Sequence, residues 1–252
     1  MFGVDIKKGE IQDSQIMAIG SLLQLFFRKK KLSFIKYLQF KIKTPIIVYG
    51  SGFIDDISSS LFLLRRLEVR AIRGYHSLQK LKSFKNKNIK ISKNLVVGDP
   101  GLLAKYLVDV SDIEKKYDLG IIPHFVDKDN LLLNKINVEN SIVIDIQQEP
   151  EIFLKQIAQC RNVISSAMHG LIAADSLGIP NVRMVLSDKI IGGNYKYDDY
   201  YSAFGIKEHK IINLSEQTFT NNDLVDISKN YKIKTEQVEQ ICKNLIENFP
   251  YK

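Results

Sequence analysis

The chain has 252 residues, of which 45% are hydrophobic and 25% are charged, a composition typical of a globular protein with a sizeable core. No apolar run reaches the roughly 18 residues needed to span a bilayer. The apolar stretch Gly20–Phe27 precedes the basic run Arg28–Lys31, which is the reverse of the order in a signal peptide. We therefore expect a cytoplasmic protein.

The formal net charge of +8 favours acidic partners such as phosphorylated small molecules, an anionic membrane or nucleic acid. Arg28–Lys31 is a true basic run, and the other basic residues are spread along the chain. Apolar residues surround this run as far as Phe40, so the segment either contacts a membrane surface or forms a core helix with a solvated end. No nucleic-acid-binding motif is present, and we expect no such partner.

Short β-branched runs alternate with amphipathic stretches, which predicts a mostly parallel α/β sheet structure. The expected strands are Gln15–Ile19, Ile46–Tyr49, Val69–Ile72, Leu95–Val97, Leu119–Ile122, Ile142–Ile146, Asn162–Ser165 and Val182–Leu186. The expected helices are Ser77–Phe84, Gly101–Val108, Pro150–Gln159, Met168–Leu177 and Thr235–Asn248. A polar stretch at Val110–Tyr117 predicts two Rossmann-like domains, 1–112 and 113–252.

Cys160 and Cys242 form no CxxC motif, and no histidine cluster accompanies them. Both lie among apolar neighbours on helical patterns, which is typical of buried free thiols. We expect no metal site.

In parallel sheets a ligand binds beyond the carboxyl ends of the strands, so the loops that follow the strands are candidate sites. Their candidate residues are Gly50, Ser51, Gly52, Arg73, Asp99, His124, Ser165 and Ser166. Each has a structural alternative: a tight turn for the glycines, a salt bridge for Arg73, a helix cap for Asp99 and packing for His124.

The segment Val163–Pro180 is the most informative part of the sequence. A strand ends at Ser165 and Ser166, and a helix begins near Ala167, which places His169 in its first turn. Free backbone N–H groups and the helix dipole favour an anion there. This pattern predicts a site for a phosphate or carboxylate, unless His169 only packs under the helix.

The string Ser-Ser-Ala-Met-His-Gly-Leu-Ile-Ala-Ala-Asp-Ser-Leu-Gly-Ile-Pro closely resembles the histidine motif of the polysaccharide pyruvyl transferase family. The segment Gly192–Ile206 resembles that family's next block, with a lysine and paired aromatic residues. Four upstream blocks follow the family's order and spacing: Ile47–Phe53, Val69–Ser77, Val96–Leu103 and Ile121–Asp127. The resemblance covers about Ile16 to Ile206.

The resemblance implies a two-lobed fold like that of glycosyltransferases with two Rossmann domains, facing across a cleft. It implies that the chain moves a pyruvyl group from phosphoenolpyruvate onto a sugar of a bacterial capsule or exopolysaccharide as a ketal, without a cofactor. His169 and Arg73 would face the donor in that cleft, with Lys196 as a third residue. The acceptor would be a sugar or a lipid-linked oligosaccharide.

Two features depart from the family pattern: an N-terminal Asn-x-Gly-Asp-type loop has no counterpart, and Ala167 lies near the place of a usual arginine. The first domain therefore looks shortened at its start. Two alternatives stay open, a nucleotide-sugar glycosyltransferase of the same fold and a non-catalytic partner in capsule assembly. Binding of UDP or GDP would favour the glycosyltransferase.

Overall fold

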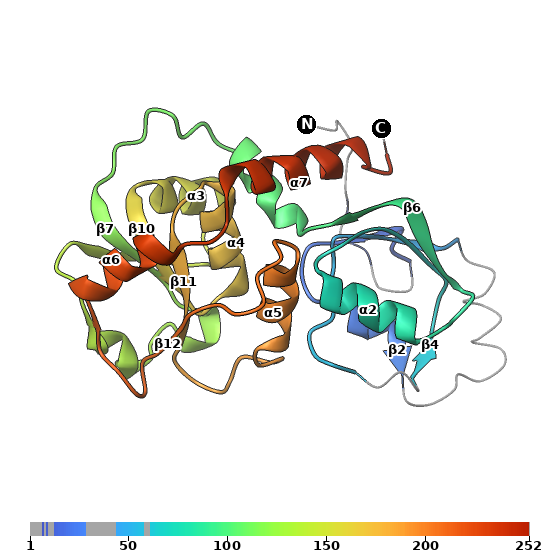
Figure 1. Cartoon of the computed structure of the whole chain (residues 1–252), viewed down its shortest axis with the longest axis horizontal. Coiled ribbons are helices and arrows are strands. Elements are labelled where there is room, and N and C mark those ends of the chain that lie inside the picture. The colour runs from blue at the N-terminus through green and yellow to red at the C-terminus, as the bar shows by residue number, and fades with distance from the viewer. Residues whose placement is uncertain (1–6, 8, 10–12, 29–43, 58–60, 252) are drawn as a thin grey trace. The chain divides into compact units, whose positions relative to one another are not determined.

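The computed structural model describes residues 7, 9, 13–28, 44–57 and 61–251 (Figure 1). Most of the basic and apolar segment that could contact a membrane, residues 29–43, lies outside these ranges. The chain is of the α/β class and divides into two compact units. Unit 1 comprises Met1–Pro100, Gly192–Lys207 and Gln240–Lys252, and unit 2 comprises Gly101–Ile191 and Glu208–Glu239. The sequence division at 112 assigned the two later segments of unit 1 to the other half.

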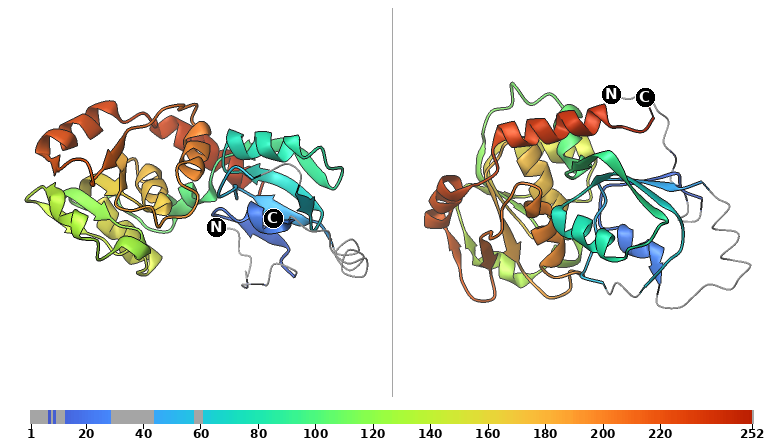
Figure 2. Two further views of the ribbon diagram at one scale, coloured as in Figure 1. Left: turned by 90° about the horizontal axis from the view of Figure 1, so that it is seen from below. Right: turned by 45° about the vertical axis from the view of Figure 1, so that its right-hand side comes forward.

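A four-stranded parallel sheet forms the centre of unit 1. Its strands in spatial order are β1 (Ile16–Ala18), β3 (Ile46–Tyr49), β5 (Leu67–Ile72) and β6 (Ile89–Val97). Helix α2 (Tyr75–Ser83) packs against β5 and helix α5 (Tyr195–Ser202) packs against α2 (Figure 2). A short 3-10 helix, η1 (Leu23–Phe26), precedes an antiparallel ribbon of β2 (Phe27–Arg28) and β4 (Phe62–Leu63).

Unit 2 is built on a five-stranded parallel sheet. Its strands in spatial order are β12 (Ile211–Asn213), β11 (Asn181–Val185), β10 (Cys160–Ser165), β7 (Tyr117–Ile122) and β9 (Ser141–Val143). If the five strands are numbered 1 to 5 in chain order, from β7 to β12, their spatial order read from β9 is 2-1-3-4-5. This is a known order of doubly wound sheets. Two small strands, β8 (Ile136–Asn137) and β13 (Phe219–Thr220), pair beside it.

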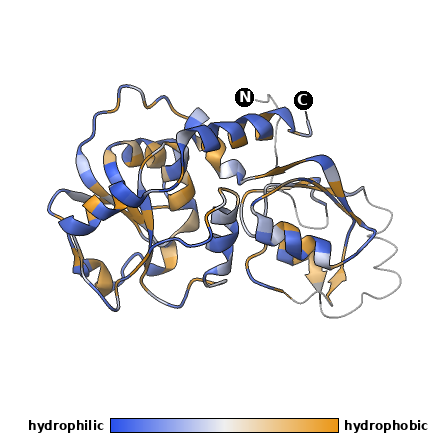
Figure 3. Ribbon diagram, in the orientation of Figure 1, coloured by the Kyte–Doolittle hydropathy of each residue, from blue (hydrophilic) through white to orange (hydrophobic). Residues whose placement is uncertain are grey.

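Both faces of the unit 2 sheet are buried, because neighbouring residues of a strand point to opposite sides. Ile121 and Ile164 belong to one apolar cluster with residues of α6 (Asn221–Asn230), while Ile122 and Val163 belong to another with α3 (Pro150–Ala158) and α4 (Met168–Ser176). Figure 3 shows the hydrophobic colour concentrated on these inner segments. Continuous apolar strands are expected in a sheet covered by helices on both faces.

The helix ends follow local sequence signals. Helix α4 ends in a Schellman motif, in which the N–H of Ile179 donates to the carbonyl of Ala174 and the N–H of Gly178 donates to that of Asp175. Gly178 has a φ of +66°, a conformation that favours glycine. Pro150 begins α3, and a Thr220–Asp223 capping box begins α6.

Three 3-10 helices lie in the connections: η2 (Pro100–Tyr106), η3 (Phe125–Asp127) and η4 (Leu131–Lys135). The helix expected at Gly101–Val108 is therefore 3-10 rather than α. The last helix, α7 (Thr235–Glu247), begins in unit 2 and ends in unit 1. In unit 1 the Tyr49 hydroxyl donates to the carbonyl of Leu245, which anchors the end of α7.

Cys160 and Cys242 are buried and form no disulfide, as predicted. The expected helical position is correct for Cys242 on α7 and wrong for Cys160, which begins strand β10. The strand expected at Ile142–Ile146 corresponds to β9, which is shorter and begins one residue earlier, at Ser141. Among the described residues no helix is both long and apolar enough to cross a membrane.

Candidate functional site

The topology of unit 2 singles out one place on its sheet. The chain leaves β7 for β9 on one side, and β10 lies on the other side of β7. Such a switch point opens a crevice beyond the carboxyl ends of the two central strands, where doubly wound sheets bind their ligands. The loop after β7 carries His124, and the loop after β10 carries Ser166 and leads to His169. The sequence-predicted residues of this unit therefore meet at the switch point.

Ser165 and Ser166 join the loops that follow the two strands. The Ser165 hydroxyl lies 2.8 Å from the carbonyl oxygen of Ile122 and accepts the N–H of Ala167 at 3.0 Å. The Ser166 hydroxyl accepts the backbone N–H of His124 at 2.8 Å. Both serine side chains are fully buried. These contacts fix the geometry of the loops, and direct contact of either serine with a substrate stays a prediction.

The first turn of α4 packs closely on the end of β10. A Cβ at Gly170 would lie 2.4 Å from Ser165 Oγ and 2.9 Å from Ile122 Cγ2. Glycine is therefore required if α4 is to begin this close to the sheet. In the Met-His-Gly sequence, the side chain of His169 is exposed to solvent, and Gly170 has no side chain that would separate the turn from the strands.

His169 is exposed in that turn. Its imidazole makes no hydrogen bond or ion pair with any other residue that the structure describes. The N–H groups of Met168 and His169 likewise have no acceptor within the described ranges, because the Gly170 N–H is the first to bond back, to the carbonyl of Ala167. Two N–H groups without an acceptor and the positive end of the helix dipole therefore lie in the same helical turn as the imidazole.

His124 is half-buried at the end of β7. Its Nδ1 accepts the N–H of Val126 at 3.4 Å, and its ring packs on Phe125 with centroids 4.5 Å apart. The histidine thus caps η3, a local structural role. A role in binding the acceptor stays a prediction.

Asp127 is a residue of this region that was not predicted as a site. Its side chain is 2% exposed, Oδ1 accepts the Ser187 hydroxyl at 2.7 Å, and Oδ2 is buried without a hydrogen bond. Ser187 follows β11, so Asp127 ties the loop after β7 to the loop after β11, which lies two strands away in the sheet. No pattern in the sequence separates Asp127 from the exposed Asp129.

Arg73 lies in unit 1, directly after β5, and is fully buried. Its guanidinium pairs with Asp199 of α5 at 2.8 Å and donates to the Ser21 hydroxyl at 2.6 Å and to the carbonyl of Phe53 at 2.5 Å. Asp199 also accepts the N–H and the hydroxyl of Ser77, both at 2.7 Å. The arginine thus holds α5 and two loops, and a contact with the donor stays a prediction.

The Gly50–Gly52 loop owes its composition to packing. Gly50 has a φ of +84°, and a Cβ there would lie 2.0 Å from a carbon of Pro100. A Cβ at Gly52 would lie 2.5 Å from the guanidinium carbon of Arg73. Ser51 is buried and donates to the carbonyl of Gly20 at 2.8 Å. These contacts agree with the tight-turn alternative for the glycines, and contact of the three residues with a substrate stays a prediction.

Lys196 and Asp99 are also buried in unit 1. Lys196 lies on α5 with its Nζ 5.3 Å from the centre of the Tyr197 ring, a cation–π contact. Asp99 directly precedes η2, the place of a helix cap. Neither geometry tests the prediction of substrate binding.

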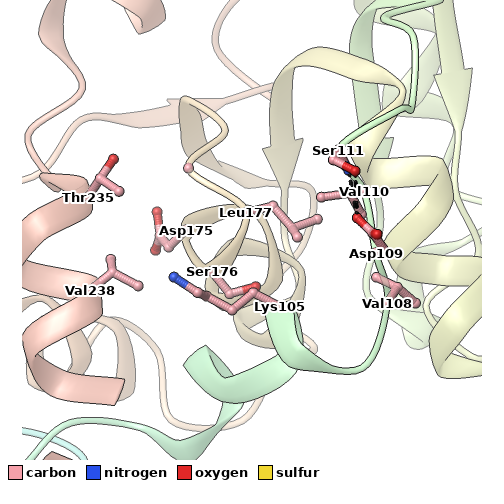
Figure 4. A pocket seen from close by; sticks show the side chains of 11 residues that line it. Lys105, Val108, Asp109, Val110, Ser111, Asp175, Ser176, Leu177, Thr235 and Val238 are labelled. Atoms are coloured by element: carbon pink, nitrogen blue, oxygen red, sulfur yellow. Dashed lines mark hydrogen bonds between the residues drawn. The ribbon is translucent and has the colours of Figure 1, made fainter. Parts of the chain in front are cut away.

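A pocket of about 500 Å³ lies elsewhere in unit 2, at the carboxyl end of α4 (Figure 4). Lys105, Asp175 and the first turn of α7 contribute polar groups to its wall, and Asp109 is tied to Ser111 by hydrogen bonds to its hydroxyl and N–H. His169 lies in the first turn of the same nine-residue helix, at its other end. In the described ranges, no three His, Cys, Asp or Glu side chains gather as a metal site would require.

Comparison with known proteins gives two relatives. The chain is 33% identical over 195 residues to the uncharacterized protein L143 of Acanthamoeba polyphaga mimivirus, covering 72% of this chain and 65% of that protein. It is 23% identical over 168 residues to the succinoglycan biosynthesis protein ExoV of Rhizobium meliloti (strain 1021), covering 65% of this chain and 49% of that protein. The matched regions thus span less than two thirds of each relative.

The family model for polysaccharide pyruvyl transferases matches residues 3–188, which include the switch point of unit 2 and the histidine turn of α4. The match covers well over half of the chain. The chain therefore belongs to the polysaccharide pyruvyl transferase family.

Proposed function

We propose that this chain transfers the pyruvyl group of phosphoenolpyruvate to two hydroxyls of one sugar and forms a cyclic ketal. The observation that carries the proposal is the exposed His169 beside two unsatisfied N–H groups at the switch point of unit 2. Family membership supports a pyruvyl transferase in general. The donor, the ketal and the identity of the polysaccharide, from a capsule or another bacterial exopolysaccharide, belong to the proposal.

Phosphoenolpyruvate carries a phosphate and a carboxylate, and the start of α4 suits either anion. The N–H groups of Met168 and His169 can donate to anionic oxygens, and the helix dipole adds to the attraction. These donors are preorganised, because Gly170 and Ser165 fix the first turn against β10. Preorganised donors stabilise developing negative charge most effectively.

In the proposed reaction, an acid adds a proton to the methylene carbon of phosphoenolpyruvate, and positive charge develops on the neighbouring carbon. A first sugar hydroxyl attacks that carbon and loses its proton. The bond from that carbon to the phosphate oxygen breaks, inorganic phosphate leaves, and a second hydroxyl attacks and closes the ring. One hydroxyl proton balances the proton that forms the methyl group, and the other leaves with phosphate.

His169 is the proposed acid and base, since imidazole exchanges protons near neutral pH. Arg73 and Lys196 are proposed to add positive charge on the donor side, from unit 1. The buried contacts of Arg73 give it a structural role as well, so its substitution needs a structural control.

The acceptor is proposed to be a sugar, either free or in a lipid-linked oligosaccharide, at the cytoplasmic face of a membrane. A nucleotide-sugar glycosyltransferase is the second candidate, because a doubly wound sheet with a helix beginning at its switch point also suits a nucleotide diphosphate.

Calorimetric titration of phosphoenolpyruvate, UDP and GDP into the purified chain tests the proposal. We expect saturable binding of phosphoenolpyruvate, weakened at least tenfold in His169→Ala and unchanged in His76→Ala, a matched exposed histidine on α2. Asp199→Ala serves as the structural control for Arg73→Ala. Binding of UDP or GDP alone would favour a glycosyltransferase, and binding of none of the three would favour a non-catalytic role.

A further inference from the structure

One short segment of unit 1 has a high net positive charge. Residues 69–98 contain eight of the 36 lysines and arginines and no aspartate or glutamate. The remaining 28 basic residues are matched by all 28 acidic residues of the chain. Residues 69–98, which run from β5 through α2 to β6, therefore have a formal charge of +8. Residues 14–54 are also basic, with seven lysines and arginines and no acidic residue.

Five lysines of this segment form what we call the lysine face: Lys82, Lys85, Lys87, Lys90 and Lys93. All five are exposed, and none has an ion pair with another described residue. The neighbouring Lys80 is different, because it is partly buried and pairs with Asp56. Exposed lysines without counter-charges produce a positive potential that attracts anions from solution.

These lysines lie on consecutive elements of unit 1. Lys82 lies in the last turn of α2, and Lys85 follows that helix with a φ of +46°, a left-handed conformation that a lysine rarely adopts. The chain then turns into β6, the edge strand of the sheet, which carries Lys90 and Lys93. Lysines protect edge strands from aggregation, but this role cannot account for the lysines on the helix and the turn.

Exposed apolar side chains lie beside the end of α2. Phe84, which ends the helix, stacks on Phe27 of β2 with ring centroids 4.2 Å apart. The elements next to Phe27 expose Leu25 of η1 at 46% and Phe62 of β4 at 40%. Figure 3 shows the β2–β4 ribbon in the hydrophobic colour below α2.

We propose that the lysine face, together with Leu25 and Phe62, binds the surface of a membrane that contains anionic phospholipids. Clustered lysines are attracted to anionic headgroups, and neighbouring apolar side chains insert at the boundary with the acyl chains. A polyphosphate or a nucleic-acid duplex would use the lysines alone, because neither offers an apolar surface or unstacked bases to leucine and phenylalanine. The proposal does not depend on the reaction proposed above.

Cosedimentation with vesicles tests the proposal. The probes are vesicles of phosphatidylcholine alone and vesicles with 30% phosphatidylglycerol, at low and at high salt. We expect binding to the anionic vesicles only, weakened at least tenfold by high salt and by glutamine at all five positions of the lysine face. A matched control replaces five other exposed lysines by glutamine: Lys128, Lys189, Lys207, Lys229 and Lys243.

The control variant has the same net charge as the test variant, so an equal loss of binding in both would overturn the lysine face as a site. Phe62→Ser and Leu25→Ser separate the two kinds of anionic partner. We expect them to weaken vesicle binding severalfold and to leave binding to a duplex oligonucleotide or polyphosphate unchanged. Tighter binding to a soluble polyanion than to anionic vesicles, with no effect of Phe62→Ser, would overturn the membrane proposal. Titration of phosphoenolpyruvate into the soluble variant tests the reaction separately.

Discussion

The guanidinium of Arg73 and the carboxylate of Asp199 form an ion pair at 2.8 Å in which neither side chain is exposed to solvent. The two residues are 126 positions apart in the sequence. A Cβ at Gly74 would lie 1.7 Å from the carbonyl oxygen of Asp199, so a glycine next to the arginine is what allows α5 to approach. The pair therefore fastens the segment Gly192–Lys207 to the rest of unit 1.

We predict that Asp199→Ala destabilises the chain by about 3–5 kcal/mol, because Arg73 keeps its buried charge and loses its counter-charge. Urea unfolding followed by circular dichroism measures the change. The double variant Arg73→Leu, Asp199→Leu should lose less stability than either single variant, since it removes both charges.

The partly exposed pair Arg70–Glu68, also 2.8 Å apart, is the matched control. Glu68→Ala should cost less than about 1 kcal/mol, as is usual for pairs at the surface. Equal costs for Asp199→Ala and Glu68→Ala would contradict a special role for the buried pair. The experiment also decides whether a loss of donor binding in Arg73→Ala reflects the donor site or a loosened unit 1.

We predict that His169→Ala lowers pyruvyl transfer by at least about 10²-fold, the usual range for loss of an acid–base group. The free energy of unfolding should stay within about 0.5 kcal/mol of the wild-type value, because the side chain is exposed and makes no described contact. Release of inorganic phosphate in the presence of acceptor and thermal unfolding are the two measurements. A large loss of stability would instead assign His169 a structural role.

We predict that Gly170→Ala destabilises unit 2 by about 1–3 kcal/mol and weakens phosphoenolpyruvate binding. The new methyl group would overlap Ser165 Oγ, and relief requires the first turn of α4 to move away from β10. Chemical denaturation and calorimetry report the two effects. Ser165→Ala removes the nearest atom, so the double variant should regain part of the stability. Normal donor binding in a destabilised Gly170→Ala variant would place the donor away from α4.

The central strands and helices could be predicted from the sequence because their signals are local. Ile46–Tyr49 is an apolar run bounded by Pro45 and Gly50 and matches β3. Met168–Leu177 was predicted as a helix to within one residue of α4, since Ser165, Gly178 and Pro180 mark its limits.

The elements that were missed lack such signals. Only the end of β6, Leu95–Val97, was predicted, because an edge strand with exposed lysines shows no regular alternation. Helix α5 was not predicted, although Tyr197, Tyr200 and Tyr201 have helical spacing and are all buried. Tyrosine is common in strands and helices alike, so its spacing alone does not identify a helix.

Only part of the candidate site could be predicted, because only contacts between residues close in sequence leave a local signal. Neighbouring residues such as Ser165 and His169 lie together in sequence and in space. The contact of Arg73 with Asp199 and that of Asp127 with Ser187 depend on tertiary packing, which composition and periodicity do not encode. Asp199 resembles a solvated acid beside Asp198 in the sequence and is fully buried in the fold.

We predict that Cys160 and Cys242 do not react with a disulfide reagent such as DTNB in the native chain at pH 8. Both thiols have no exposed surface, and burial raises the pKa of Cys160 to about 12, against a smaller opposing effect of the charge on Lys115. Since the thiolate is the reactive form, its fraction at pH 8 would be on the order of 10⁻⁴.

After unfolding in guanidinium chloride, both thiols of each chain should react at once. Cys160→Ser should remove half of that signal and leave the native chain unreactive. Rapid reaction of one thiol in the native wild-type chain, absent from Cys160→Ser, would show that β10 opens to solvent, because Cys160 is the first residue of that strand.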